Sequence, residues 1–115
     1  MKERRRHPRV PIRLPLEYWH TDDAYHGGVV GNVSEMGLLI YSIKSMPVGT
    51  HLSIRIFFND GYEFDAFQVR ARIVWKGYHS EEKWEGYKYG LEFTGISEED
   101  RHKLVKILNA RFPLE

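Results

Sequence analysis

The sequence contains no cysteine, and this absence excludes disulfides, thiolate zinc sites and cysteine nucleophiles. It has no apolar run of the length needed to cross a bilayer. The charged residues 1–6 lead into no apolar stretch of the kind that a signal peptide requires. We therefore expect a cytoplasmic protein that makes no membrane contact. Its 115 residues, 42% hydrophobic and 29% charged, have the length and composition of one globular domain.

Residue patterns that serve catalysis are missing as well. The histidines are spread along the chain, and no two of them have the i, i+4 spacing that places two metal ligands on one face of a helix. Ser34 does not fit the exposed nucleophile of a hydrolase, because Asn32 and Met36 stand where that sharp turn needs glycine. The sequence therefore predicts no metal, no cofactor and no enzymatic activity.

Positive charge is concentrated at the start of the chain. Residues 1–13 hold six basic side chains against one acidic, a net charge of +5, whereas the other residues hold 11 basic and 15 acidic side chains, a net charge of −4. A basic arm on an acidic body suits the binding of an anion at one place, although an exposed, solvated tail has the same composition. Arg5 and Arg9 matter most, because a planar guanidinium matches both phosphate oxygens and the O6 and N7 acceptors of guanine.

Six segments have the pattern of β-strands, and one has the pattern of a helix. Apolar residues alternate with polar ones in most of the strand segments, and the third is apolar throughout. The strands are expected at 12–18, 29–33, 38–41, 52–58, 67–75 and 87–93, a polar loop at 79–83, and the helix at 97–112. The alternation places Trp75 on the same apolar face as Ile73. Short strands separated by turns predict a closed or nearly closed antiparallel barrel, with the helix packed against it or over one open end.

The segment Asn32-Val33-Ser34-Glu35-Met36-Gly37 places polar groups between two apolar strands. In a strand, Asn32 and Ser34 point to the same face, where they offer an amide and a hydroxyl for hydrogen bonding. Gly37 allows the chain to turn and the backbone to approach a ligand closely. A turn stabilised by the Asn or Ser side chain explains the same residues without any ligand, so the pattern alone leaves both interpretations open.

Two of these features together resemble the signature motifs of the PilZ family: Arg5-x-x-x-Arg9 and, one strand later, Asn32-x-Ser34-x-x-Gly37. The order of arm, barrel and terminal helix is similar too, and the resemblance covers essentially the whole chain. It implies a mainly β fold, a six-stranded antiparallel β-barrel with one C-terminal α-helix. A single domain then divides into an arm at 1–10, a barrel at 11–96 and a helix at 97–112.

PilZ domains are receptors for the dinucleotide cyclic di-GMP, and the resemblance implies a role for each matching residue. Arg5 and Arg9 would hold guanine and phosphate from the arm. Asn32 and Ser34 would hydrogen-bond a guanine from the barrel surface, which Gly37 would keep open. Many family members have Asp in place of this Asn, so an amide oxygen replaces a carboxylate acceptor and a lower affinity is expected.

Two further residues enter through the resemblance. Arg4 is an additional arginine just before the arginine motif, and family members with an arginine in that place tend to bind an intercalated pair of ligands. Trp75 stands at a strand end where similar domains place an aromatic side chain close to the ligand. The alternative for Trp75 is a place in the core or on the barrel rim.

The sequence thus predicts a non-catalytic cyclic di-GMP receptor. Its arginine arm would become ordered when the ligand binds, and it would relay the signal to a partner protein that the sequence does not identify. One alternative is a PilZ-like adaptor that contacts proteins without binding the ligand, and the intact motifs argue against it. The other is a small barrel that binds single-stranded nucleic acid, and the acidic barrel argues against that.

Overall fold

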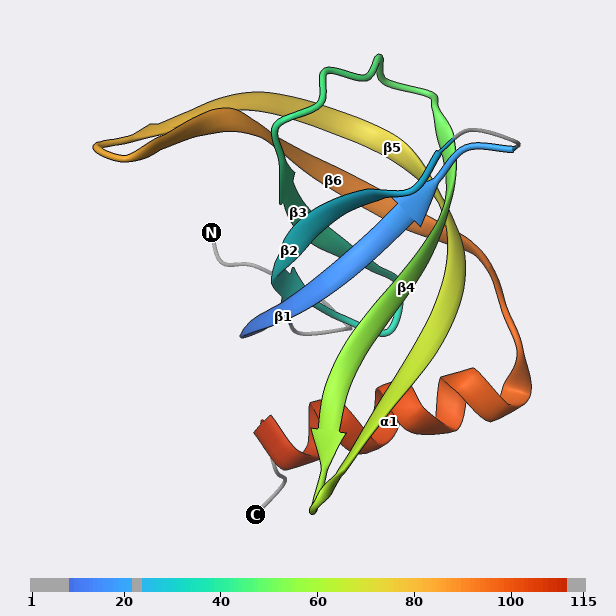
Figure 1. The fold of residues 1–115 in the computed structure, drawn as a ribbon. Coiled ribbons are helices and arrows are strands. Elements are labelled where there is room, and N and C mark those ends of the chain that lie inside the picture. The colour runs from blue at the N-terminus through green and yellow to red at the C-terminus, as the bar shows by residue number, and fades with distance from the viewer. Residues whose placement is uncertain (1–8, 22–23, 112–115) are drawn as a thin grey trace, which may run out of the picture.

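The computed structural model describes residues 9–21 and 24–111, and within them the chain forms six strands and one helix. The strands are β1 (Val10–Trp19), β2 (His26–Val33), β3 (Gly37–Ser42), β4 (His51–Asp60), β5 (Glu63–Glu81) and β6 (Trp84–Ile96), and the helix is α1 (Glu98–Arg111). All neighbouring strands are antiparallel. They close into a barrel in the order β1-β2-β3-β6-β5-β4 (Figure 1). The predicted six-stranded barrel with a C-terminal helix is confirmed.

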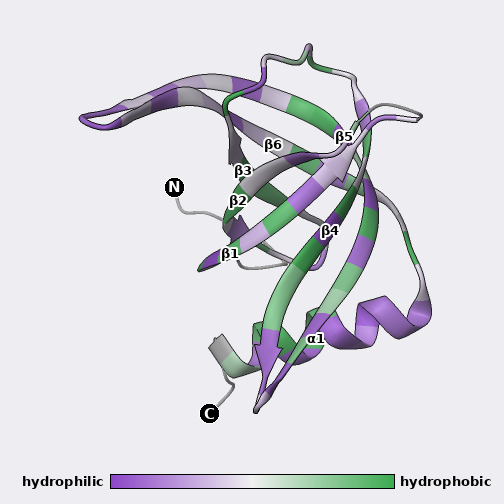
Figure 2. Ribbon diagram, in the orientation of Figure 1, coloured by the Kyte–Doolittle hydropathy of each residue, from purple (hydrophilic) through white to green (hydrophobic). Residues whose placement is uncertain are grey.

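The alternating apolar residues of the strands fill the barrel. In β4, Leu52, Ile54 and Ile56 are at most 3% exposed, and the polar residues between them lie on the outer face. Figure 2 shows the resulting mixture of hydrophobic and hydrophilic bands along the strands. Burial of each such side chain stabilises the fold by about 1.5–3 kcal/mol, so this periodicity fixes which face of each strand is the inside.

The helix α1 lies across one end of the barrel (Figure 1). Its apolar residues Leu104, Ile107 and Leu108 are buried, and Ser97 caps it by accepting a hydrogen bond from the Asp100 amide at 3.1 Å. Within residues 9–21 and 24–111, no helix combines the length and apolar character that a membrane-spanning helix requires.

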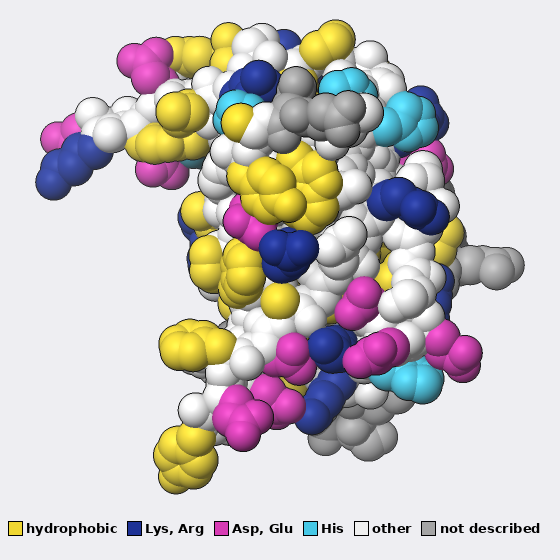
Figure 3. All heavy atoms as spheres, turned by 45° about the vertical axis from the view of Figure 1, so that its right-hand side comes forward, with side chains coloured by type: hydrophobic (Ala, Val, Ile, Leu, Met, Phe, Trp, Pro, Cys, Tyr) yellow, Lys and Arg dark blue, Asp and Glu magenta, His cyan; other side chains and the backbone are white. Residues whose placement is uncertain are grey.

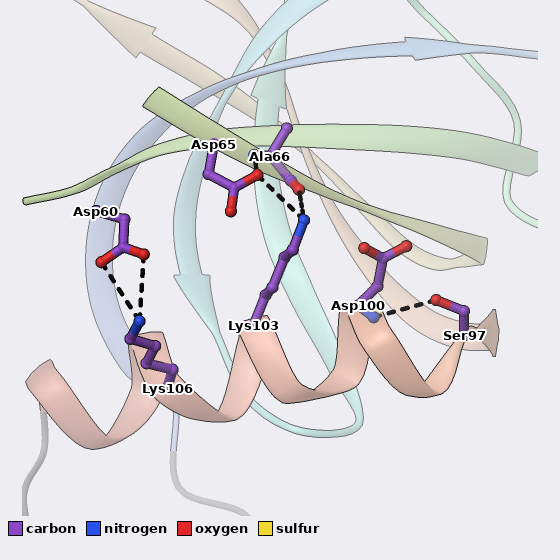
Figure 4. A network of polar contacts seen from close by, with 7 residues as sticks. All are labelled: Asp60, Asp65, Ala66, Ser97, Asp100, Lys103 and Lys106. Atoms are coloured by element: carbon purple, nitrogen blue, oxygen red, sulfur yellow. Dashed lines mark hydrogen bonds and ion pairs between the residues drawn. The ribbon is translucent and has the colours of Figure 1, made fainter. Parts of the chain in front are cut away.

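Two lysines of the helix attach it to the β4–β5 hairpin (Figure 4). Lys103 donates hydrogen bonds to an oxygen of Asp65 and to the carbonyl of Ala66, both at 3.1 Å. Lys106 pairs with Asp60 at 3.2 Å. The amide of Ala66 and Lys103 both stabilise the carboxylate of Asp65, and they lower its pKa.

The predicted loop at 79–83 is too long, because only residues 82–83 form the turn. The strand β5 continues to Glu81, which pairs with Trp84 at the start of β6, so the two strands form a long hairpin that projects from the barrel on the side remote from α1 (Figure 1). The polar residues misled the prediction because this part of the hairpin lies beyond the core, and a strand with no buried face needs no alternating pattern.

The placement of Trp75 on the apolar face is also wrong. Ile73 pairs with Leu91 and Trp75 with the adjacent Gly90, so Val74 is an extra residue, a β-bulge. A single inserted residue reverses the side to which the following side chains point. Trp75 is therefore on the outer face and 46% exposed.

Candidate functional site

A row of paired residues crosses the outer face of five strands. Asn32 of β2 pairs with Pro11 of β1 and with Leu39 of β3. Leu39 pairs with Gly90 of β6, which pairs with Trp75 of β5. Leu39 lies between Leu38 and Ile40, which point into the core and are at most 2% exposed, so its own side chain faces outward. Strand pairing alone thus brings Asn32 and Trp75, far apart in the sequence, onto one surface.

A second β-bulge determines the face of the barrel to which the Asn32 side chain points. Val30 pairs with Ile40 and Asn32 with Leu39, so Gly31 is an extra residue in β2. Val30 and Val33 are both buried, with 1% and 3% exposure, and the bulge places two residues rather than one on the outer side between them. The oxygen Oδ1 of Asn32 is buried, yet within the described part of the chain it accepts no hydrogen bond. An unpaired buried acceptor of this kind costs about 1–3 kcal/mol.

The side chain of Trp75 packs against the backbone of Gly90. A Cβ atom placed on Gly90 would be 3.3 Å from Cβ of Trp75 and 3.5 Å from its ring atom Cε3. Glycine at this position therefore leaves room for the indole, which a larger residue would displace by a few tenths of an ångström. The Nζ atom of Lys88 is 5.7 Å from the centroid of the ring, a cation–π distance. The result is an exposed aromatic platform with a positive charge beside it.

Arg9 and Trp75 line the same hollow, of about 280 Å³. The other residues that line it are Leu39, Val74, Gly90 and Leu91. Arg9 is exposed and lies at the start of the described chain. The structure therefore brings the second arginine of the arm to the tryptophan platform, next to the strand position that pairs with Asn32.

Ser34 lies beyond the end of β2, in the turn to β3. Its hydroxyl accepts a hydrogen bond from the Met36 amide at 3.1 Å and donates a longer one, of 3.4 Å, to the carbonyl of Gly37. The Ser34 amide donates to the same carbonyl at 2.9 Å, and the residue is only 5% exposed. In this structure the Ser34 side chain stabilises the turn.

Position 37 requires glycine because the backbone of β6 passes very close to it. A Cβ atom at this position would lie 2.1 Å from the carbonyl oxygen of Leu91, which no side chain tolerates. This contact explains the glycine by the packing of β3 against β6. Its expected role in keeping the surface open to a ligand stays a prediction.

The remaining predicted residues, Arg4 and Arg5, lie outside the described residues. Sequence reasoning missed Leu39, Gly90 and Val74, which line the hollow together with the predicted residues Arg9 and Trp75. A signal was present only for Gly90, because a glycine inside a strand often marks the close approach of another group.

The model of the PilZ domain family matches residues 3–110. The chain belongs to the PilZ family. No curated protein matches its sequence.

Solved structures share the PilZ fold at low sequence identity. The Bacillus subtilis inhibitor of motility MotI/DgrA has a TM-score of 0.77 at 19% identity, and the match covers 96% of this chain and 52% of that one. This chain therefore spans about half the length of MotI/DgrA. The PilZ domain of Escherichia coli YcgR, solved with c-di-GMP, has a TM-score of 0.73 at 16% identity, with 95% and 92% covered. The PilZ domain of CeSA from a cellulose-synthesizing bacterium has a TM-score of 0.61 at 15% identity, with 90% and 96% covered.

Proposed function

We propose that this PilZ domain is a non-catalytic receptor for cyclic di-GMP, which binds on the outer row from Asn32 to Trp75. One observation carries the proposal: Arg9 and Trp75 line one hollow with Leu39, and Leu39 pairs with Asn32, whose buried Oδ1 accepts no hydrogen bond within the described chain. The likeness to a YcgR domain solved with c-di-GMP supports the same ligand.

Each group in the row suits one part of a guanine nucleotide. The exposed indole of Trp75 offers a stacking surface, and stacking of a base on an aromatic side chain contributes about 1–3 kcal/mol. The Oδ1 atom of Asn32 accepts hydrogen bonds, and guanine offers donors at N1–H and N2–H₂. The guanidinium of Arg9 donates to a phosphate or to O6 and N7 of guanine. Binding would thus give Asn32 the donor that it lacks within the described chain.

The arm extends the proposal to residues that the structure does not describe. Arg5 would act with Arg9 on guanine and phosphate, and Arg4 would allow an intercalated pair of ligands. Binding would order the arm that precedes β1 against the barrel, and the changed surface would contact a partner protein in the cytoplasm. Val10 already pairs with Val33 in the barrel, so amide hydrogen exchange tests the ordering ahead of it: we expect protection to rise at residues 4–9 and 32–37 on addition of ligand, with little change in α1. Protection of the arm without ligand, or none with it, would contradict the switch.

Nucleic acid fits the barrel less well. The face shown in Figure 3 carries acidic and basic side chains side by side rather than a continuous basic stripe. Binding of a nucleic acid strand relies on a row of cations that follows the phosphates. A compact ligand with two phosphates needs only the few cations that the arm provides.

Calorimetric titration tests the proposal directly. We expect cyclic di-GMP to bind in the micromolar range and GTP not to bind, because one guanine with a linear triphosphate does not reach the arm and the row together. A short single-stranded oligonucleotide is the second control. Equal binding of GTP, or binding of the oligonucleotide alone, would overturn the proposal, and no binding of any of them would favour a protein adaptor. With Arg4→Leu, we expect the stoichiometry to fall from two ligands per chain to one.

A further inference from the structure

The strands β2 and β3 separate near one end of the barrel. Their last pair is Val29 with Tyr41. Beyond it, β2 continues to His26 along β1, and β3 continues to Ser42 along β6. A cleft of about 540 Å³ opens between the two strands and the projecting β5–β6 hairpin. Sites for small molecules have volumes of about 300–1,000 Å³, so the cleft has the size of a ligand site.

Three aromatic rings form one wall of this cleft. Tyr41 of β3 meets His79 of β5 at a centroid distance of 4.9 Å, and His79 meets Trp84 of β6 at 5.4 Å. Tyr41 and Trp84 are 6.1 Å apart and nearly perpendicular, at 84°. All three residues are partly exposed, so their rings combine mutual packing with a surface open to a ligand.

Glycines keep the cleft open on both sides. A Cβ atom on Gly86 would lie 2.8 Å from the Ser42 carbonyl oxygen and 3.1 Å from the Trp84 ring, so glycine there lets the indole lie close to the end of β3. On the opposite side, a Cβ atom on Gly27 would meet no atom within 4 Å. Gly27 lines the cleft, so a larger side chain at this position has open space to occupy there.

The charged groups of the cleft favour an anion. Arg13 lies over the Tyr41 ring, with its Cζ atom 5.6 Å from the centroid, and Lys44 lines the cleft as well. No ion pair joins either of them to another residue of the described chain. Glu81 is the acidic residue that lines the cleft, and it already contacts His79 at 3.0 Å. Two cations thus face the space beside an aromatic wall.

We propose that the cleft between β2, β3 and the β5–β6 hairpin is a second ligand site, for a small planar aromatic anion. The aromatic wall would stack on or edge against the ring of the ligand, and Arg13 and Lys44 would bind its acidic group. The cleft shares no lining residue with the hollow at Trp75. Binding in the cleft can therefore be measured without cyclic di-GMP.

Naphthalenesulfonate is a suitable probe, because it combines an aromatic ring system with one negative charge. Naphthylmethanol lacks the charge, and cyclohexanesulfonate lacks the aromatic ring. We expect two-dimensional ¹H–¹⁵N spectra of the full chain to show shifts for Gly27, Gly28, Tyr41 and His79, without shifts for Gly90. We expect naphthalenesulfonate to bind at least about tenfold more tightly than naphthylmethanol, since a hydrogen bond to a charged group contributes that much. We expect it to bind more tightly than cyclohexanesulfonate as well, since aromatic contacts contribute about 0.5–1.5 kcal/mol beyond the burial of area.

Two variants test the assignment. Gly27→Leu fills the empty space without a clash at Cβ, and we expect it to abolish binding of naphthalenesulfonate while the rest of the spectrum is retained. We expect Arg13→Gln to weaken binding about tenfold, to the level of naphthylmethanol, and the matched change Arg101→Gln on the exposed face of α1 to leave it unchanged. Shifts outside the cleft, or unchanged binding in Gly27→Leu, would overturn the site. Equal binding of naphthylmethanol, or unchanged binding in Arg13→Gln, would overturn its preference for an anion.

Discussion

Replacement of Asn32 by leucine tests the site through two effects of opposite sign. The Oδ1 atom of Asn32 is buried and unpaired within the described chain, and a group of this kind costs the folded state about 1–3 kcal/mol. Leucine has nearly the same shape and no polar atom. We therefore expect Asn32→Leu to raise the free energy of unfolding, by about 1 kcal/mol after part of the benefit is lost to imperfect packing.

The same substitution removes the acceptor proposed for guanine. We expect the affinity for cyclic di-GMP to fall about tenfold, which corresponds to about 1.4 kcal/mol. Urea unfolding measures the first effect and calorimetric titration the second. Asn109→Leu, at an exposed position of α1, is the matched control and should bind the ligand like the unchanged protein. A variant of Asn32 that lost stability and kept its affinity would show that the amide serves the fold rather than the ligand.

Three further predictions follow from single contacts. Gly37→Ala should destabilise the protein by about 3 kcal/mol or more, because its Cβ atom would meet the Leu91 carbonyl at 2.1 Å; in thermal unfolding, a variant as stable as the control Gly27→Ala would disprove the clash. Trp75→Ala should weaken ligand binding by about 1–3 kcal/mol in calorimetry with little loss of stability, since the ring is 46% exposed, whereas Tyr62→Ala at the β4–β5 hairpin should leave binding unchanged. Asp65 has a lowered pKa because of the Ala66 amide and Lys103. The ionised carboxylate therefore stabilises the folded state fully above the unfolded-state pKa of about 4, and this stabilisation is lost as the pH falls through the lower folded-state pKa. The stability difference between the unchanged protein and Asp65→Asn should therefore shrink in acid, and a constant difference would refute this linkage.

The barrel could be predicted from the sequence because its information is local. Residues such as Ile54 and Ile56 alternate with polar neighbours, and this period of two identifies both the strand and its inner face. The start of α1 is local information of the same kind, because Ser97 is a residue type that caps helices and the acidic residues after it suit the first turn. Where no face is buried, as at the tip of the β5–β6 hairpin, the pattern carries no information and the prediction failed.

The site could be predicted only in part. The motif residues were identified by resemblance, but their arrangement depends on pairing between strands that are distant in the sequence. The bulges at Gly31 and Val74 decide that Asn32 and Trp75 both lie on the outer row, and one extra residue in a strand leaves little trace in the sequence. Ser34 shows the opposite case, because the turn interpretation that the sequence left open describes its hydrogen bonds in the structure.

The central claim is that cyclic di-GMP binds on the row from Asn32 to Trp75, and mapping its contacts by ¹H–¹⁵N spectroscopy tests this most directly. We expect saturating cyclic di-GMP to shift the signals of Arg9, Asn32, Leu39 and Gly90, and the indole N–H of Trp75, with little change at Trp84 or in α1. Binding that leaves the Trp75 indole and the Asn32 signals in place while other signals move would contradict the account.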